Sequence, residues 1–288
     1  MMAKPTVRRA RLPHTLGVCS GAALAAAALG ACSGGSTAAA ADPVAAVQRA
    51  ALTSAQAGSA KVATDVTMAV GSQTTRFVGT GLFDLAGQIG TITLQKTDQN
   101  GKASGPALDE VVTPGSLYLR DDQQGAKWGE VTSAHLADGD LISAGYTNPV
   151  LAFALLRGAG GSAGPVEYVG RETIRGVKVT HYSGKLDLTA SANAAAGAVK
   201  ADLGAAALAF SQKTVPFDVY LDGQGRVNRV TTHYSFPAAA PQQGQVLISS
   251  TTDLYDFGTP ASVATPAPSD LATANPTAAP NSGSAAGN

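Results

Sequence analysis

The segment Val150–Arg157 reads VLAFALLR and constrains the fold of this chain more than any other segment. Asn148 and Pro149 precede it as an N-cap residue and a first-turn proline, so the sequence predicts a helix here. Apart from Arg157 the helix is apolar on every side, and such a helix has to be buried all round. The rest of the fold must therefore supply a surface that wraps around it.

Most of the remaining chain has the alternating pattern of β-strands. Val62, Val66 and Met68, for example, alternate with polar residues and predict a half-buried strand. Strands are predicted at 61–70, 75–85, 89–96, 108–113, 116–120, 127–131, 166–174, 177–188, 215–221, 226–236 and 245–257. Two further helices are predicted, one from Asp42-Pro43 to about residue 57 and one over the alanine-rich segment 189–211.

So many strands and so few helices favour an α+β fold in which a single sheet curves around the apolar helix. Packing on a flat sheet would leave one side of that helix exposed to water, and the helix has no polar side to expose. Gly79 and Gly81 lie between apolar residues of one strand and indicate curvature or a close approach to the backbone. Where packing under the helices is incomplete, the remaining space is apolar and suits an apolar guest.

The first 31 residues have the pattern of an export signal. A head that is basic and has no acidic residue is followed by a short apolar run and by Leu29-Gly30-Ala31-Cys32. We expect cleavage between Ala31 and Cys32, and a diacylglycerol thioether on the Cys32 thiol. The alternative is an uncleaved anchor helix, but the run is shorter than the roughly 20 apolar residues that span a bilayer.

These features divide the chain into four parts. We expect a lipoprotein signal peptide at 1–31, a flexible tether at 32–41, one folded domain at 42–263 and a disordered Ala/Pro/Ser-rich tail at 264–288. The predicted location is the extracytoplasmic face of the cell membrane. Two or three acyl chains would hold the protein there stably, whereas one chain gives marginal binding.

Charge and cysteine content exclude several classes of function. The chain has 20 basic and 20 acidic residues, and the signal removes four basic ones, which leaves 16 against 20 and a net charge of −4. The sequence has no basic patch of the kind that binds nucleic acid. Cys19 belongs to the signal and Cys32 is the acylation site, so disulfides, thiolate metal sites and cysteine catalysis are excluded.

No catalytic or cofactor motif is present. The sequence has no G-x-S-x-G elbow, phosphate-binding loop or dinucleotide fingerprint, so we expect no catalytic residue, metal or cofactor. His181 and His233 lie in two strands that share the string Thr-His-Tyr-Ser, and they are either a metal or acid–base pair or ordinary strand histidines. Asp222–Gly225 is a hairpin turn, or a calcium loop that lacks further acids. Trp128 is either a core or edge anchor or a surface that stacks on a ligand.

Several short strings resemble one family. They are Gly81-Leu82-Phe83-Asp84, Tyr118-Leu119-Arg120 with Lys127-Trp128, Asn148-Pro149, GVKVTHY at 176–182, DVYLDGQGRV at 218–227 and DFGTP at 256–260. Together with the lipobox Leu29-Gly30-Ala31-Cys32, which is the lipoprotein cleavage motif, these strings resemble the LppX/LprG-type lipoproteins of actinobacteria. Those lipoproteins are similar to the LolA carrier fold. The resemblance covers residues 42–263. It implies an unclosed half β-barrel with helices on its concave face, and a hydrophobic cavity between them that takes acyl chains in characterised members.

The sequence therefore favours a membrane-anchored, monomeric lipoprotein that binds or carries a lipid or another hydrophobic ligand. The candidate cavity residues are Val66, Met68, Phe77, Phe83, Leu94, Val111, Leu151, Phe153 and Leu155. The expected partners are the membrane and an acyl-chain ligand, with an envelope protein as an open alternative. Two other functions stay open: an interaction, scaffold or sensor lipoprotein whose cavity is filled by side chains, and a hydrolase with an unrecognised site.

Overall fold

The structure is a computed structural model of the 288-residue chain, and it describes residues 42–98, 100–121, 126–136, 141–142, 148–237 and 244–272. The predicted signal peptide, the cleavage site at Ala31 and Cys32, the acylation site and the tether lie outside the described residues. So does the predicted tail beyond residue 272. The described residues together form one domain.

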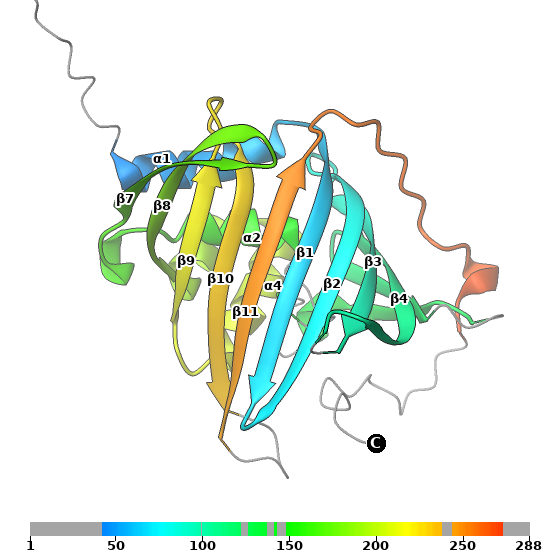
Figure 1. Ribbon diagram of the computed structural model, residues 1–288. Helices are drawn as coiled ribbons and strands as arrows, with labels where there is room; N and C mark the ends of the chain where they lie inside the picture. The colour runs from blue at the N-terminus through cyan, green and yellow to red at the C-terminus, as the bar shows by residue number, and fades with distance from the viewer. Residues whose placement is uncertain are drawn as a thin grey trace, which may run out of the picture. The chain divides into compact units, whose positions relative to one another are not determined.

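Eleven strands form one antiparallel sheet, in the order β6-β5-β4-β3-β2-β1-β11-β10-β9-β8-β7 (Figure 1). The strands are β1 Ser59–Val70, β2 Gln73–Asp84, β3 Ile89–Thr97, β4 Ala103–Thr113, β5 Ser116–Asp121, β6 Gly129–Thr132, β7 Glu167–Ile174, β8 Val177–Asp187, β9 Thr214–Leu221, β10 Val227–Pro237 and β11 Gln245–Tyr255. The pairing of β1 with β11 joins an N-terminal and a C-terminal meander. The end strands β6 and β7 do not pair with each other, so the sheet stays open.

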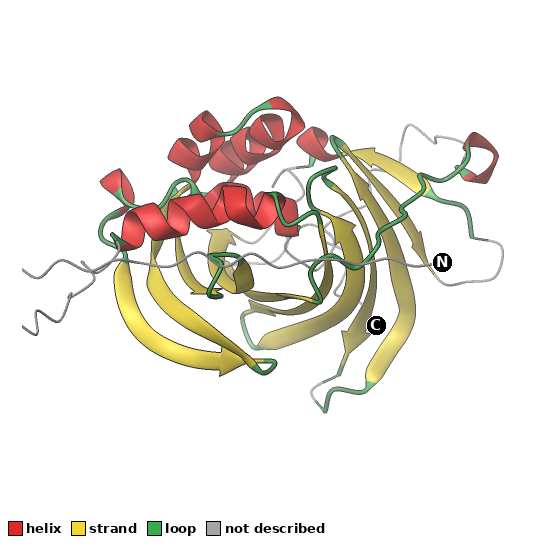
Figure 2. Cartoon of the chain, turned by 90° about the horizontal axis from the view of Figure 1, so that it is seen from above, coloured by secondary structure: helices red, strands yellow, loops and turns green. Residues whose placement is uncertain are grey.

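Four α-helices in the described residues gather over one face of the sheet, which curves beneath them (Figure 2). They are α1 Pro43–Ala55, α2 Pro149–Leu156, α3 Leu188–Ala194 and α4 Gly197–Ala209, with short 3₁₀ turns η1 Ser133–His135, η2 Gly161–Ala163 and η3 Pro268–Asp270. The predicted α+β fold, a curved and unclosed antiparallel sheet with helices on its concave face, is confirmed.

The predicted helix starts are correct, and one predicted helix is divided. Asp42 and Asn148 each accept a hydrogen bond from the backbone N–H two residues on, at 3.0 Å, and a proline follows each of them. The alanine-rich segment predicted as one helix forms two helices, α3 and α4. The backbone has an extended conformation at Ala195 and a left-handed conformation at Gly197, where φ is +60°. Glycine is the residue that enters this region at no steric cost.

Helix α2 is the centre of the core, as its composition predicts. Pro149, Leu151, Ala152, Phe153, Leu155 and Leu156 are all buried. Leu155 packs in the same core cluster as Leu203 of α4 and Phe217 of β9. Fully burying a leucine of this kind stabilises a fold by about 1.5–3 kcal/mol.

Three glycines let β2 and β3 pack tightly under the helices. A Cβ added at Gly79 would lie 2.6 Å from Leu94 Cδ2, and one at Gly81 would lie 2.1 Å from the Thr91 carbonyl oxygen. A Cβ at Gly90 would lie 2.2 Å from Phe83 Cδ1. The close approach that the sequence predicts at Gly79 and Gly81 is therefore made by neighbouring strands of the sheet.

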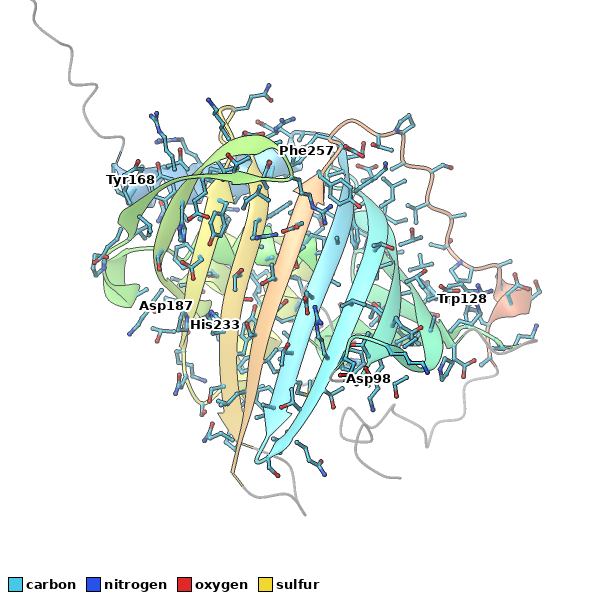
Figure 3. All side chains as sticks on the ribbon, in the orientation of Figure 1. Asp98, Trp128, Tyr168, Asp187, His233 and Phe257 are labelled. Carbon is cyan, nitrogen blue, oxygen red and sulfur yellow. The ribbon has the colours of Figure 1, made fainter. Side chains whose placement is uncertain are left out.

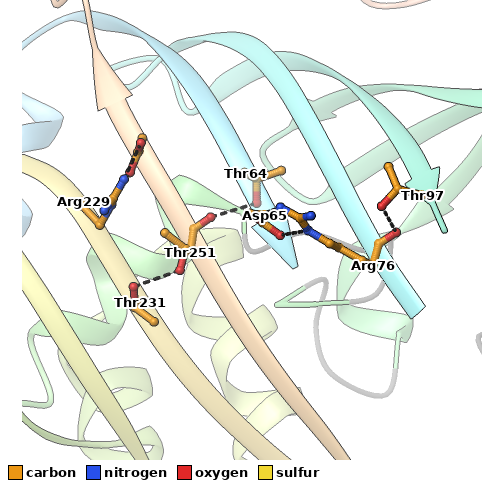
Figure 4. A network of polar contacts seen from close by, with 8 residues as sticks. Thr64, Asp65, Arg76, Thr97, Arg229, Thr231 and Thr251 are labelled. Atoms are coloured by element: carbon orange, nitrogen blue, oxygen red, sulfur yellow. Dashed lines mark hydrogen bonds and ion pairs between the residues drawn. The ribbon is translucent and has the colours of Figure 1, made fainter. Parts of the chain in front are cut away.

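The face of the sheet that points away from the helices is polar. Figure 4 shows its cross-strand contacts, among them Asp65 with Arg76, whose Nε donates at 2.8 Å, and the hydroxyls of Thr231 and Thr251, 3.0 Å apart. Asp253 accepts hydrogen bonds from Arg229 at 2.5 and 2.9 Å. This face takes up water and ion pairs, and the helix-covered face holds the apolar core.

Residues 264–272, which the sequence assigns to the tail, run to the β6 edge of the sheet. The Trp128 backbone N–H donates to Asp270 O at 2.9 Å, and Trp128 O accepts from the N–H of Ala272 at 2.8 Å. The Arg120 guanidinium lies 4.3 Å from the centre of the Trp128 ring. Figure 3 labels Trp128 beside the C-terminal segment that contains residues 268–270. Of its two predicted roles, half-buried Trp128 has that of an edge anchor.

Candidate functional site

A groove of about 710 Å³ lies between α1, α2 and the junction of α3 with α4. Its lining is mostly alanine and larger apolar side chains. The lining residues are Ala45, Gln48, Arg49, Ala51, Leu52, Ala55, Leu85, Gln88, Val150, Phe153, Ala154, Arg157, Ala194, Ala195, Ala196 and Val199. Small alanine side chains on α1, α2 and α3 and between α3 and α4 leave the space that larger residues would fill.

Close contacts at the end of α2 hold α1 in place. Gln48 Nε2 donates to the Ala159 carbonyl at 2.7 Å. A Cβ added at Gly160 would lie 2.7 Å from Val44 Cγ1, so glycine is required for this approach. The C-terminal end of α2 therefore lies against the first half of α1.

Helix α3 is fixed to the other side of α2 by one buried serine. Ser191 Oγ lies 2.9 Å from the Leu155 carbonyl oxygen and 2.8 Å from that of Asp187. Gly158 makes room for it, because a Cβ there would lie 2.2 Å from Ser191 Oγ. Helices α1 and α3 are therefore held on opposite sides of α2, and the distance between them sets the width of the groove.

The groove has a buried apolar floor. Ala51, Leu85, Phe153 and Val199 are each less than a tenth exposed and form the bottom. Leu52, on the rim, is 62% exposed, which is a large apolar exposure for a helix that packs on a core. An apolar floor and an exposed leucine at the rim are suited to an apolar ligand.

The electrostatics of the groove are one-sided. Its described lining includes the arginines Arg49 and Arg157 and the amides Gln48 and Gln88, and no acidic side chain is among these described residues. Neither guanidinium forms an ion pair with a residue that the structure describes. The described lining of the groove therefore carries two positive charges and no negative side chain.

The structure places the predicted cavity residues at different sites. Phe153 lines the groove. Five others, Val66, Phe83, Leu94, Leu151 and Leu155, are buried in the core cluster, and Met68 packs against it. Phe77 is half-buried and lies opposite Val66 on the same face. The predicted set therefore describes the packed core more than a hollow.

Val111 is on the wrong face for a cavity under the helices. The β3–β4 register sets Val112 opposite Gly90 and Val111 opposite Thr91. Val112 belongs to the core cluster, and because neighbouring side chains of a strand alternate, Val111 points to the other face. The sequence has valine at both positions, so its pattern alone did not separate the two faces.

Most of the groove was not predicted from the sequence. Its residues on α1 and at the α3–α4 junction are largely alanines, which give no signal of a binding surface. One signal was present: Leu52 lies beside Ala51 at the edge of the apolar stripe of α1 and is the exposed member of the pair. A leucine off the buried stripe of a packed helix marks a surface of interest.

His181 and His233 do not form a pair. Strand β9 separates their strands, and the residue of β10 in line with His181 is Arg229, four residues before His233. His181 instead contacts Glu172 through Nδ1 at 2.9 Å and Asp218 through Nε2 at 2.7 Å. In the described residues, no three histidine, cysteine or acidic side chains are grouped to hold a metal.

Asp222 is occupied within its own hairpin. Its Oδ1 accepts from the backbone N–H groups of Gln224 and Arg226, both at 2.9 Å, and its Oδ2 accepts from Arg226 Nε at 2.8 Å. The segment therefore has the hairpin-turn role that the sequence favours over a calcium loop.

In the part of the chain that the structure describes, no helix combines the length and apolarity needed to cross a bilayer.

The sequence matches no protein-family model and no curated protein. Among solved structures the chain is similar to the lipoprotein LppX of Mycobacterium tuberculosis, with 14% identity over 76% of this chain and 98% of LppX and a TM-score of 0.38. It is also similar to LprF of Mycobacterium bovis, with 14% identity over 77% and 97% of the two chains and a TM-score of 0.37. A putative outer membrane lipoprotein-sorting protein domain of Vibrio parahaemolyticus has 9% identity over 76% and 93% and a TM-score of 0.28. Lipoproteins of the type that the sequence resembles are thus among the structures to which this chain is similar.

Proposed function

We propose that this chain is a lipid-anchored lipoprotein of the extracytoplasmic membrane face that binds an apolar molecule, such as a lipid, in the groove between α1, α2 and the α3–α4 junction. One observation carries the proposal: a groove of about 710 Å³ with a buried apolar floor and an exposed leucine on its rim. Sites for small ligands usually measure about 300–1,000 Å³ and are mostly apolar. The lipobox ending in Cys32 supports the anchor.

The energetics of an acyl chain suit such a groove. Each methylene removed from water contributes about 0.8 kcal/mol, so ten of them supply roughly 8 kcal/mol before the costs of ordering and immobilisation. The floor residues are already packed against the core, so little protein order has to be created on binding. A preformed surface of this kind keeps more of the gross binding energy as affinity.

The groove supports binding rather than catalysis. Among the lining residues that the structure describes, none is a serine, cysteine, histidine, aspartate or glutamate. A hydrolase needs a nucleophile or a general base within reach of its substrate. The residues that the groove does supply can hold and orient a ligand.

The experiment compares a filled groove with an open one. The full chain carrying Cys32→Ala, which removes the acylation site, is titrated with the methyl ester of cis-parinaric acid, a neutral fluorescent acyl chain. We expect saturable binding with one molecule per chain. Ala154→Phe, which adds a ring inside the groove, should weaken binding at least about tenfold, because the ring takes the space of the acyl chain.

Ala205→Phe is the matched control, since Ala205 is a half-buried helical alanine outside the groove. It should leave the affinity unchanged. Circular dichroism and thermal unfolding check that both variants fold. If the parent protein does not bind the ester saturably, or if Ala154→Phe binds it as the parent does, the proposal is wrong and a scaffold or sensor role takes its place.

A further inference from the structure

The two ends of the groove differ in polarity. Gln48 of α1 donates to Ala159 just beyond α2, which places Arg49, the next residue of α1, near the C-terminal end of α2 where Arg157 lies. The other end is formed by the last turn of α1 and the first turn of α2. There the Leu85 N–H donates to Gly58 O at 2.7 Å, just beyond α1, and Leu85 lines the groove with Ala55, Gln88 and Val150. One end is basic and the opposite end is mainly apolar.

The two arginines lack the ion pair that most described arginines form. Arg76, Arg120, Arg175, Arg226 and Arg229 each form an ion pair with an aspartate. Arg49, Arg157 and Arg171 form no ion pair with any residue that the structure describes. Two of these three line one groove, and the third is on the edge strand β7.

The charge at the basic end favours an anion. The C-terminal end of α2 carries about half a negative charge from its backbone dipoles, which alone would repel an anionic group. Two guanidinium groups outweigh it, and no acidic side chain among the described lining residues opposes them. Arginine also binds a carboxylate through two parallel hydrogen bonds, which a neutral ester cannot accept in the same way.

We infer that the ligand of this groove is a long-chain fatty acid, with its carboxylate at Arg49 and Arg157 and its acyl chain over Phe153 toward Leu85. The inference rests on the proposed function and adds the chemical class and the direction of the ligand. A single chain with a compact acidic head matches a groove that has one basic end and one apolar floor. The arginines select the acid, and the floor supplies the affinity that is common to all acyl chains.

The test uses two probes with the same acyl chain, one with a charged head group and one with a neutral head group. cis-Parinaric acid and its methyl ester share one fluorescent chain, and at about pH 8 the acid is ionised. For the full chain carrying Cys32→Ala, we expect the acid to bind at least about tenfold more tightly than the ester. Raising the salt concentration from about 0.05 to about 0.5 M should reduce this preference, because the arginines are exposed and salt screens them.

Substitution of the arginines separates charge from packing. Arg49→Gln together with Arg157→Gln should lower the ratio of acid affinity to ester affinity at least about tenfold. Arg171→Gln is the matched control, because Arg171 is exposed, unpaired with any described residue and outside the groove. It should change neither affinity.

The outcomes distinguish this inference from the proposed function. If neither probe binds, the proposed function fails and this inference fails with it. If both probes bind equally and the double variant changes neither affinity, only the assignment of a fatty acid is overturned. The same holds if palmitoyl lysophosphatidylglycerol displaces the probe but palmitate does not, because the head group would then be a phosphodiester.

Discussion

The side chain of His181 connects the three outer strands of the C-terminal meander. It belongs to β8 and contacts Glu172 on β7 and Asp218 on β9, and its ring stacks on Tyr220 with centroids 4.2 Å apart. Ionised carboxylates only accept hydrogen bonds, so both contacts are satisfied when both ring nitrogens carry hydrogen. This one side chain therefore ties the edge strand β7 to the interior of the sheet.

Replacing His181 by alanine should lower the free energy of unfolding by about 1–3 kcal/mol, because two charge-assisted contacts are lost at a site that is 8% exposed. Urea denaturation monitored by circular dichroism measures the change. His233→Ala provides the control, since His233 is exposed and should cost little. Equal effects for the two histidines would mean that the Glu172 and Asp218 contacts contribute nothing.

Asp202 is a second residue with a measurable signature. It is 6% exposed on α4, and burial raises the pKa of its carboxyl above the ordinary value of 3.8, although a hydrogen bond donated by Ser133 Oγ at 2.7 Å partly opposes the shift. The folded state thus binds the proton more tightly than the unfolded state. Its contribution to stability is fully present below pH 3.8 and is lost as the pH rises through the raised pKa.

Asp202→Asn removes the charge and keeps an oxygen that can accept from Ser133. We expect this variant to be more stable than the parent at neutral pH and to lack the decline above pH 3.8 that this carboxyl causes. Thermal unfolding across the acidic to neutral range checks both points. A variant whose stability follows the parent at every pH would contradict the effect of burial.

At the scale of the elements, alternation along the strands was the strongest signal in the sequence. The predicted strand segments all exist, because residues such as Val62 and Val66 are required on the buried face and polar residues are required on the other. The break between α3 and α4 was not predicted, because the alanine-rich segment has no local residue that forces a helix to stop except Gly197. The face of Val111 depended on register, which is set by the partner strands.

The glycines of β2 and β3 belong to this scale as well. Gly90→Ala should lower the free energy of unfolding by about 1–3 kcal/mol, because the new methyl group would lie 2.2 Å from Phe83 Cδ1 and would displace a buried ring. Gly170→Ala is the matched strand control, since a Cβ there meets nothing within 4 Å. Chemical denaturation of both variants tests this, and similar stabilities would show that Phe83 can move without strain.

At the scale of the whole domain, the same principle explains both the fold and the groove. The apolar residues of α2 require burial, and the open sheet supplies it on one side. Helices α1, α3 and α4 cover the rest incompletely, because alanines line the places where they meet. The sequence could predict the buried helix, but a groove between helices depends on how they pack, and Phe153 was the only predicted residue to line it.

The central claim is that an acyl chain lies in this groove, and photo-crosslinking tests it most directly. A palmitate that carries a diazirine near its methyl end is irradiated with the full chain carrying Cys32→Ala, and labelled peptides are mapped by mass spectrometry. We predict labels near Leu52, Leu85 and Phe153 that excess unlabelled palmitate removes. Labels that competitor does not remove, or labels confined to surfaces such as Leu208, which is 87% exposed and outside the groove, would contradict it.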